Sequence, residues 1–204
     1  LSIAVSAFIG ILMGIWMATS KRLAVKNTLL GIATLGVSIP GFVTAILLMM
    51  VFGVWWPVLP IVGLGSPANY ILPVAAQSFG QIASIARLTK STYSEAIQMD
   101  YVTMARAKGL SNMYITVRHV LKNALIPVVT YFGPAIAFLI TGSFVVESIF
   151  SIPGIGREFT NAITNRDYTV VLGFSVFIGV IITVANLAVD IICSLIDPRI
   201  KLTN

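Results

Sequence analysis

Few residues of this sequence could carry out chemistry within the chain itself. The 204 residues include one histidine, His119, and one cysteine, Cys193. One histidine cannot form a metal cluster with others, and one cysteine provides neither an internal disulfide nor a cysteine-based metal site. The phosphate-binding pattern G-x-x-x-x-G-K-[ST] is absent from the sequence, so any ATP chemistry requires another chain. We therefore expect a protein that is not an enzyme and that has no metal or cofactor of its own.

Two acidic residues lie where a carboxylate could act inside or beside a membrane. Asp190 follows Asn186 by four residues in a long apolar segment, so both lie on one helix face. An intramembrane carboxylate is a candidate functional group. The position of Asp190 near the end of the segment also suits an interfacial or subunit-pairing role, and we favour this structural interpretation. Glu147 ends another apolar segment, where it could contact the amine of a peptide, cap a helix or pair with Arg157.

The elements that must position these residues are long and apolar. Hydrophobic residues make up 57% of the sequence and charged residues 10%, whereas soluble domains carry about 25% charged residues. About 20 apolar residues cross the roughly 30 Å of hydrocarbon in a bilayer. Charged residues are absent from four windows: 1–20, 27–86, 123–146 and 168–189. The longest window is divided by Trp55-Trp56-Pro57, an aromatic, helix-breaking sequence that suits a turn at the membrane interface.

These windows predict an all-α protein, a polytopic transmembrane helix bundle. We expect five spans, at about 1–20, 28–53, 71–90, 123–146 and 168–195. Eleven of the thirteen lysines and arginines then fall on one side of the membrane, leaving only Arg157 and Arg166 on the other. Because basic residues favour the cytoplasmic side of short loops, the N-terminus is predicted outside and the C-terminus in the cytoplasm. The net charge of +6 then reflects topology, and we expect membrane lipid but no nucleic acid as a partner.

Small and helix-breaking residues occur within the predicted spans. Gly10 and Gly14 form a GxxxG pattern, which lets helix backbones approach closely where lipid gives no hydrophobic driving force. Pro40 and Pro134 lie inside predicted spans and can kink them. Either feature could serve gating, but ordinary helix packing is the interpretation that we favour.

The segment 91–122, between the third and fourth spans, is predicted to form a compact cytoplasmic loop. Thr92 and Glu95 fit a capping box that would open a helix. The apolar residues that follow recur at helical spacing and form one stripe: Ile97, Tyr101, Met104 and Ala105. The more polar positions of this helix are Asp100, Arg106 and Lys108. The two basic residues come near its end, where they complement the helix dipole.

The second half of the loop begins with a turn. Gly109 fits the left-handed residue that ends a helix, and Leu110 fits the hydrophobic residue that follows it. Ser111 can cap a second short helix that reaches Lys122. An amphipathic helix in such a loop can lie on lipid or dock on a partner protein. The small side chain of Ala105 favours docking.

These loop motifs resemble the EAA loop of ATP-binding-cassette importer permeases. The resemblance rests on Ala105-x-x-x-Gly109 and on Leu121. Four positions depart from the usual Glu, Ala, Ile and Pro of that loop: Thr103, Met104, His119 and Lys122. Other motifs, spread over essentially the whole chain, resemble the B-type permease of oligopeptide and dipeptide importers: Asp100-Tyr101-Val102, Ala105 to Ser111, His119 with Asn123 to Pro127, Gly142-Ser143 with Glu147 and Phe150, Pro153 to Gly156, Arg166-Asp167-Tyr168, Asn186, Asp190 and Asp197-Pro198-Arg199.

The resemblance implies a type I importer permease fold, with residues 1–204 as one transmembrane domain and a sixth span ahead of residue 1. It implies a pore subunit for peptides in the cytoplasmic (inner) membrane of a bacterium or archaeon. The implied partners are a second related permease, two ATPase subunits that bind ATP and Mg, and an extracellular or periplasmic substrate-binding protein. The implied ATPase-coupling residues are Asp100, Tyr101, Met104, Ala105, Arg106, Lys108, Gly109, Leu110 and Ser111. The translocation path is expected to include Ser143, Glu147 and Phe150.

Other functions remain open at this point. A secondary transporter would need internal repeats and ionisable groups near the midplane of the membrane, and an intramembrane enzyme would need a nucleophile with a base or metal ligands in its spans. The sequence shows neither pattern. Similar permeases carry nickel chelates or glutathione as well as peptides, and the residues do not distinguish these substrates.

Overall fold

A computed structural model describes residues 1–140 and 144–196, and within these ranges it consists of helices and their connections, without a strand. The α-helices are α1 (Ser2–Thr19), α2 (Leu23–Ser38), α3 (Gly41–Met49), α4 (Ile71–Ala96), α5 (Asp100–Ala107), α6 (Asn112–Ile115), α7 (Leu121–Ala124), α8 (Ile126–Ile140), α9 (Phe144–Ile149), α10 (Ile155–Thr164) and α11 (Tyr168–Ile196). Two π-helical turns, Met50–Trp55 and Thr116–Val120, and a 3-10 turn, Pro67–Tyr70, complete them.

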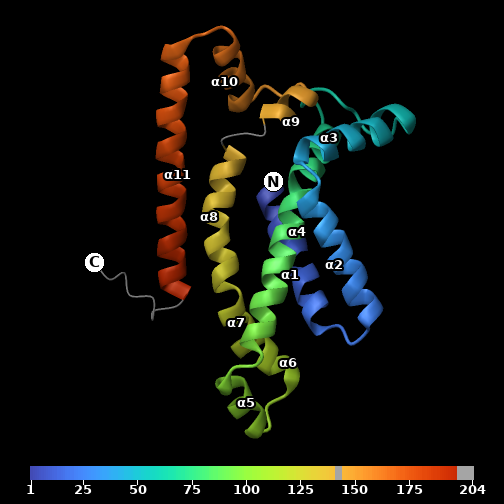
Figure 1. Ribbon diagram of the computed structural model, residues 1–204, viewed down its shortest axis with the longest axis vertical. Helices are drawn as coiled ribbons and strands as arrows, with labels where there is room; N and C mark the ends of the chain where they lie inside the picture. The colour runs from blue at the N-terminus through green and yellow to red at the C-terminus, as the bar shows by residue number, and fades with distance from the viewer. Residues whose placement is uncertain (141–143, 197–204) are drawn as a thin grey trace.

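The helices form a layer of long elements with shorter ones at both ends (Figure 1). α4 packs along α1 and also contacts α2 and α3, while α8 packs against α11. The short helices α5, α6 and α7 lie together at one end of the molecule, and α3, α9 and α10 lie at the other (Figure 1). The loop predicted to face the cytoplasm is therefore separated by the length of α4 from the segments predicted to face outward.

Two helices, α1 and residues Tyr168–Leu195 of α11, are long and apolar enough to cross a membrane, by length and composition. A third span is counted if α2 is joined to the bent segment Gly41–Trp55. α4 is long, but Gln77, Gln81 and Arg87 make it less apolar, and the apolar part of α8 is short. The predicted polytopic helix bundle is confirmed, whereas the count of five spans stays a prediction for the segments beyond these two or three.

The second predicted span, 28–53, is divided into two helices that meet at a sharp bend. α2 ends at Ser38 and α3 begins at Gly41, with a bend of 102° between the two parts. Pro40 has no N–H to donate, and a proline disfavours helical backbone in the residue before it. Ile39 accordingly adopts φ −87° and ψ 120°. The kink expected at Pro40 is thus a complete break of the helix.

The third span continues past its predicted end at residue 90, since α4 extends to Ala96. Thr92 therefore lies inside a helix, where its hydroxyl donates to the Leu88 carbonyl at 3.1 Å. Glu95 accepts a hydrogen bond from the Ser91 hydroxyl at 3.0 Å. The predicted capping box is wrong, because Thr92 and Glu95 lie within α4 and form their side-chain hydrogen bonds with Leu88 and Ser91 of the same helix.

The GxxxG residues of α1 face α4, as the packing interpretation requires. A methyl group added to Gly10 would lie 2.8 Å from the Cβ atom of Ile85. One added to Gly14 would lie 2.5 Å from the Cβ atom of Thr89. Contacts between carbon atoms are optimal at about 3.5–4.0 Å, so only glycine allows these backbones to lie so close.

Candidate functional site

The end of α5 has the geometry that the sequence predicted. Gly109 adopts φ +75°, the left-handed region in which side chains are disfavoured. Its N–H donates to the Arg106 carbonyl at 2.9 Å, and the Leu110 N–H donates to the Ala105 carbonyl at 3.3 Å. These two bonds are the Schellman pair that satisfies the last carbonyls of a helix. The glycine turn between the two helical parts of the loop is confirmed.

The second helical part also follows its local signals. Ser111 precedes α6, and its hydroxyl accepts a hydrogen bond from the Tyr114 N–H at 3.4 Å. From Asn112 the chain remains helical through a π-helical turn to Ala124. The predicted cap at Ser111 is confirmed, and the second helix extends slightly beyond Lys122.

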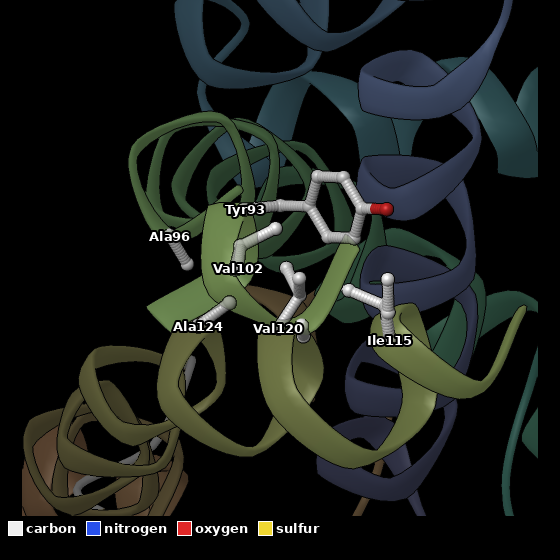
Figure 2. Packing of buried hydrophobic residues seen from close by; sticks show 7 residues of the cluster. Tyr93, Ala96, Val102, Ile115, Val120 and Ala124 are labelled. Atoms are coloured by element: carbon white, nitrogen blue, oxygen red, sulfur yellow. The ribbon is translucent and has the colours of Figure 1, made fainter. Parts of the chain in front are cut away.

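The loop is built around a small hydrophobic core of its own, which we call the loop core (Figure 2). Seven buried residues from α4, α5, α6, the following π-helical turn and α7 compose it: Tyr93, Ala96, Val102, Ala105, Ile115, Val120 and Ala124. The Tyr93 hydroxyl lies 3.3 Å from the Thr116 hydroxyl oxygen. Ala18 of α1 packs against the same core. The loop is therefore a folded unit joined to α1 and α4.

The predicted apolar stripe of α5 is divided between this core and the surface. Ala105 is 6% exposed and belongs to the loop core, and Ile97 and Tyr101 pack against it. Met104, in contrast, is 60% exposed. The sequence suggested one face for docking, but most of that face is covered by α4 and the second half of the loop. Ala105 is not available to a partner in this arrangement.

The loop exposes several large apolar side chains. Six of them, taken together, are called the outer face below: Met99, Met104, Leu110, Met113, Tyr114 and Val117. The polar coupling candidates Asp100, Arg106 and Lys108 are exposed beside them, as are Gly109 and Ser111. Six exposed large apolar side chains within residues 99–117 make this loop a candidate interaction site. Sequence reasoning missed Met99, Met113, Tyr114 and Val117, although large apolar residues within a charged loop were a usable signal.

Of the three residues expected to line the translocation path, the structure describes Glu147 and Phe150, and both make contacts within the chain. Ser143 lies outside the described residues, as do Gly142 and Asp197-Pro198-Arg199. The Glu147 carboxylate accepts a hydrogen bond from the backbone N–H of Arg157 at 2.9 Å, near the N-terminus of α10. This is the capping role considered for Glu147, because a carboxylate stabilises the first turn of a helix. Phe150 is buried in a core with Ala45, Leu72, Ala76 and Val146.

The remaining polar candidates do not converge on a catalytic arrangement. Asp190 is exposed on α11, while Asn186 lies against Gly133 of α8. His119 is partly buried and its ring packs edge-on against Tyr114, with ring centres 5.8 Å apart. No group of three or more His, Cys, Asp or Glu side chains that could hold a metal ion occurs among the described residues.

A bundle of apolar helices of this kind is typical of a polytopic membrane protein, and comparison with known proteins specifies the class. The chain belongs to the family of binding-protein-dependent transport system inner membrane components, whose model matches residues 10–202. It is 42% identical over 201 residues to the dipeptide transport system permease protein DppB of Bacillus subtilis, covering 98% of this chain and 65% of that protein. It is 41% identical to the oligopeptide transport system permease protein OppB of Salmonella typhimurium, covering 96% of this chain and 65% of the relative.

The chain thus spans about 65% of the length of these relatives. The resemblance to B-type permeases seen in the sequence is confirmed by them. The fold is similar to the inward-facing MetNI methionine ABC transporter, with a TM-score of 0.73, 18% identity and coverage of 96% of this chain and 91% of that one. An amino acid ABC transporter solved with histidines gives a TM-score of 0.64 at 18% identity, covering 98% of this chain and 89% of that one. The predicted importer permease fold is confirmed.

Proposed function

We propose that this chain is a pore-forming permease subunit of an ATP-driven importer for peptides in the cytoplasmic membrane of a bacterium or archaeon. The relatives named above, which are permeases for dipeptides and oligopeptides, support the substrate class. The observation that carries the coupling role is the outer face, six exposed large apolar side chains on a loop that already has its own core. Water-exposed apolar groups of this number are stabilised when a partner protein covers them.

Three kinds of partner complete the proposed transporter. The sequence contains no phosphate-binding loop, so two separate ATPase subunits would bind ATP and Mg and dock on the outer face. A second related permease would complete the pore, as the resemblance to importer permeases implies. A substrate-binding protein would deliver the peptide at the opposite end, beside α10. Motion of the ATPases would reach the spans through the loop core.

The outer face is tested by the substitution Met104→Glu. We expect the ATPase subunits to be lost during purification and peptide uptake to fall at least about tenfold, because a carboxylate would be desolvated in the contact. The thermal stability of the permease should not change, since Met104 is exposed. The matched control is Ile163→Glu, at a residue 52% exposed on α10, which should retain the ATPases. Full ATPase retention by Met104→Glu would contradict docking, and peptide uptake without any bound ATPase would favour a secondary transporter.

The proposed orientation is tested by cysteine labelling in a Cys193→Ser background. Asn161 on α10 and Asn112 at the start of α6 are both exposed. A cysteine at Asn161 should react with a membrane-impermeant thiol reagent added to intact cells, and a cysteine at Asn112 should react only after the cells are opened. Asn69 is unsuitable as a reporter because it is 8% exposed and its amide donates to the Val62 carbonyl at 2.7 Å. Labelling of Asn112→Cys from outside would reverse the proposed topology.

A further inference from the structure

A groove with a volume of about 520 Å³ opens at the break between α2 and α3, against α4 and α8. Pro40 lies at the break, and Tyr131 reaches the groove from α8. Three polar residues of α4 line it: Gln77, Gln81 and Ser84. Their spacing of four and three residues places them on one helix face. Gln81 comes ten residues after the start of α4 at Ile71, about 15 Å along the helix axis, so this face lies within the predicted third span.

The hydrogen-bonding capacity of this face is only partly used within the chain. The Tyr131 hydroxyl donates to the Gln81 side-chain carbonyl at 2.8 Å, which leaves the two N–H donors of the Gln81 amide directed elsewhere. Ser84 donates to the Gly80 carbonyl at 3.0 Å. Gln77, Gln81 and Ser84 are all partly exposed. An amide that faces hydrocarbon without a partner is costly, so this groove is suited to water or a polar ligand.

The backbone beside the groove supports the same conclusion. A break inside a membrane segment leaves carbonyl and N–H groups without helical partners, and such backbone is tolerated only where protein buries it or where it lines a water-filled cavity. The bend of 102° at Pro40 borders the groove. Two independent features, the amide-bearing face of α4 and the broken helix, therefore meet at one place.

We propose that this groove is a section of the translocation path and that its glutamines bind the main-chain amides of the passing peptide. This inference rests on the proposed function and specifies which part of the substrate is recognised. Glutamine side chains both donate and accept hydrogen bonds, as peptide groups do. The lining residues that the structure describes include no charged side chain. A neutral wall of this kind contacts what all peptides share and does not select among charged side chains.

The groove is tested in the assembled transporter by the reactivity of a cysteine at Gln81. The background is Cys193→Ser, since Cys193 is the single cysteine, is buried, and lies 3.3 Å from the Thr130 hydroxyl, a contact that serine can keep. The matched control is Val180→Cys, at a residue 56% exposed on the apolar helix α11. A small cationic methanethiosulfonate should modify Gln81→Cys at least about tenfold faster than the control, because lipid excludes the reagent. Tri-alanine should slow the reaction at Gln81→Cys only.

Transport provides the second measurement. Gln81→Leu should lower tri-alanine uptake roughly three- to tenfold, the effect of losing a hydrogen bond to a neutral group, while ATPase subunits still copurify. Gln81→Asn, which keeps an amide, should restore part of the uptake. Equal labelling of Gln81→Cys and Val180→Cys would overturn the groove as an aqueous path, and labelling that tri-alanine does not slow would overturn peptide binding there. Both results differ from failure of the proposed function, in which the unsubstituted transporter imports no peptide.

Discussion

Replacing Gly14 by leucine is expected to separate α1 from α4 and to leave little assembled permease in membrane extracts. A methyl group at this position would lie 2.5 Å from the Cβ atom of Thr89 and 2.7 Å from the Ala86 carbonyl oxygen. The second contact is with backbone, so no rotation of a side chain relieves it. Overpacking of a well-packed site typically costs about 1–3 kcal/mol, occasionally more. We expect the upper end of this range or beyond, because the helices must move apart along their length.

The control for this prediction is Gly31→Leu on α2, where an added methyl group meets nothing within 4 Å. Both proteins would be compared by membrane abundance and by thermal unfolding of the purified permease in detergent. The Gly31→Leu protein should match the unsubstituted one, since Gly31 is exposed. A normal amount of Gly14→Leu protein with an unchanged unfolding temperature would show that α1 and α4 do not pack as described.

Replacing Ala105 by arginine is expected to unfold the loop core rather than to block a partner directly. Ala105 is 6% exposed among Val102, Ile115 and Val120. The longer side chain overfills this space, and its guanidinium must either lose water or force α5 outward. Together these effects should destabilise the loop by about 3 kcal/mol or more. Loss of ATPase binding should follow, because the outer face is held in place by this core.

Hydrogen exchange of the loop amides distinguishes this effect from a surface effect. Amides of residues 100–124 should exchange faster in the Ala105→Arg protein, while those of α1 and α11 keep their protection. The control is Met104→Arg at the neighbouring exposed position, which should leave exchange in the loop unchanged. If Ala105→Arg kept full protection of the loop, the assignment of Ala105 to the core would be refuted.

Features determined by neighbouring residues were predictable from the sequence. The turn at Gly109 and the cap at Ser111 depend on backbone conformation and on one hydrogen bond each, and both were found as predicted. The apolar windows likewise indicated a helical membrane protein. The Thr92–Glu95 pattern did not mark the start of a helix, because α4 continues through both residues. A capping sequence has no such effect inside a helix.

Features determined by distant segments were not predictable in the same way. Whether Ala105 faces a partner or the chain itself depends on α6 and the π-helical turn Thr116–Val120, which contact α5 and contribute Ile115 and Val120 to the same core. Glu147 of α9 can cap α10 only because these two short helices fold back on each other. For the groove, a signal did exist: Gln77, Gln81 and Ser84 recur at helical spacing within an uncharged segment. The sequence indicated a kink at Pro40, but it did not indicate that the resulting break brings this face to a cavity.

The unbroken length of α4 connects the two sites mechanically. The same helix carries Gln81 in the groove and Tyr93 in the loop core, and it is continuous from Ile71 to Ala96. Gln81 and Tyr93 are twelve positions apart, about 18 Å along the helix, so a tilt of about 10° at the loop displaces the groove face by about 3 Å, roughly the length of a hydrogen bond. If the groove binds peptide and the loop binds ATPases as proposed, a rigid rod of this length would release a bound peptide amide when the loop is pushed, without a change in the fold of either site.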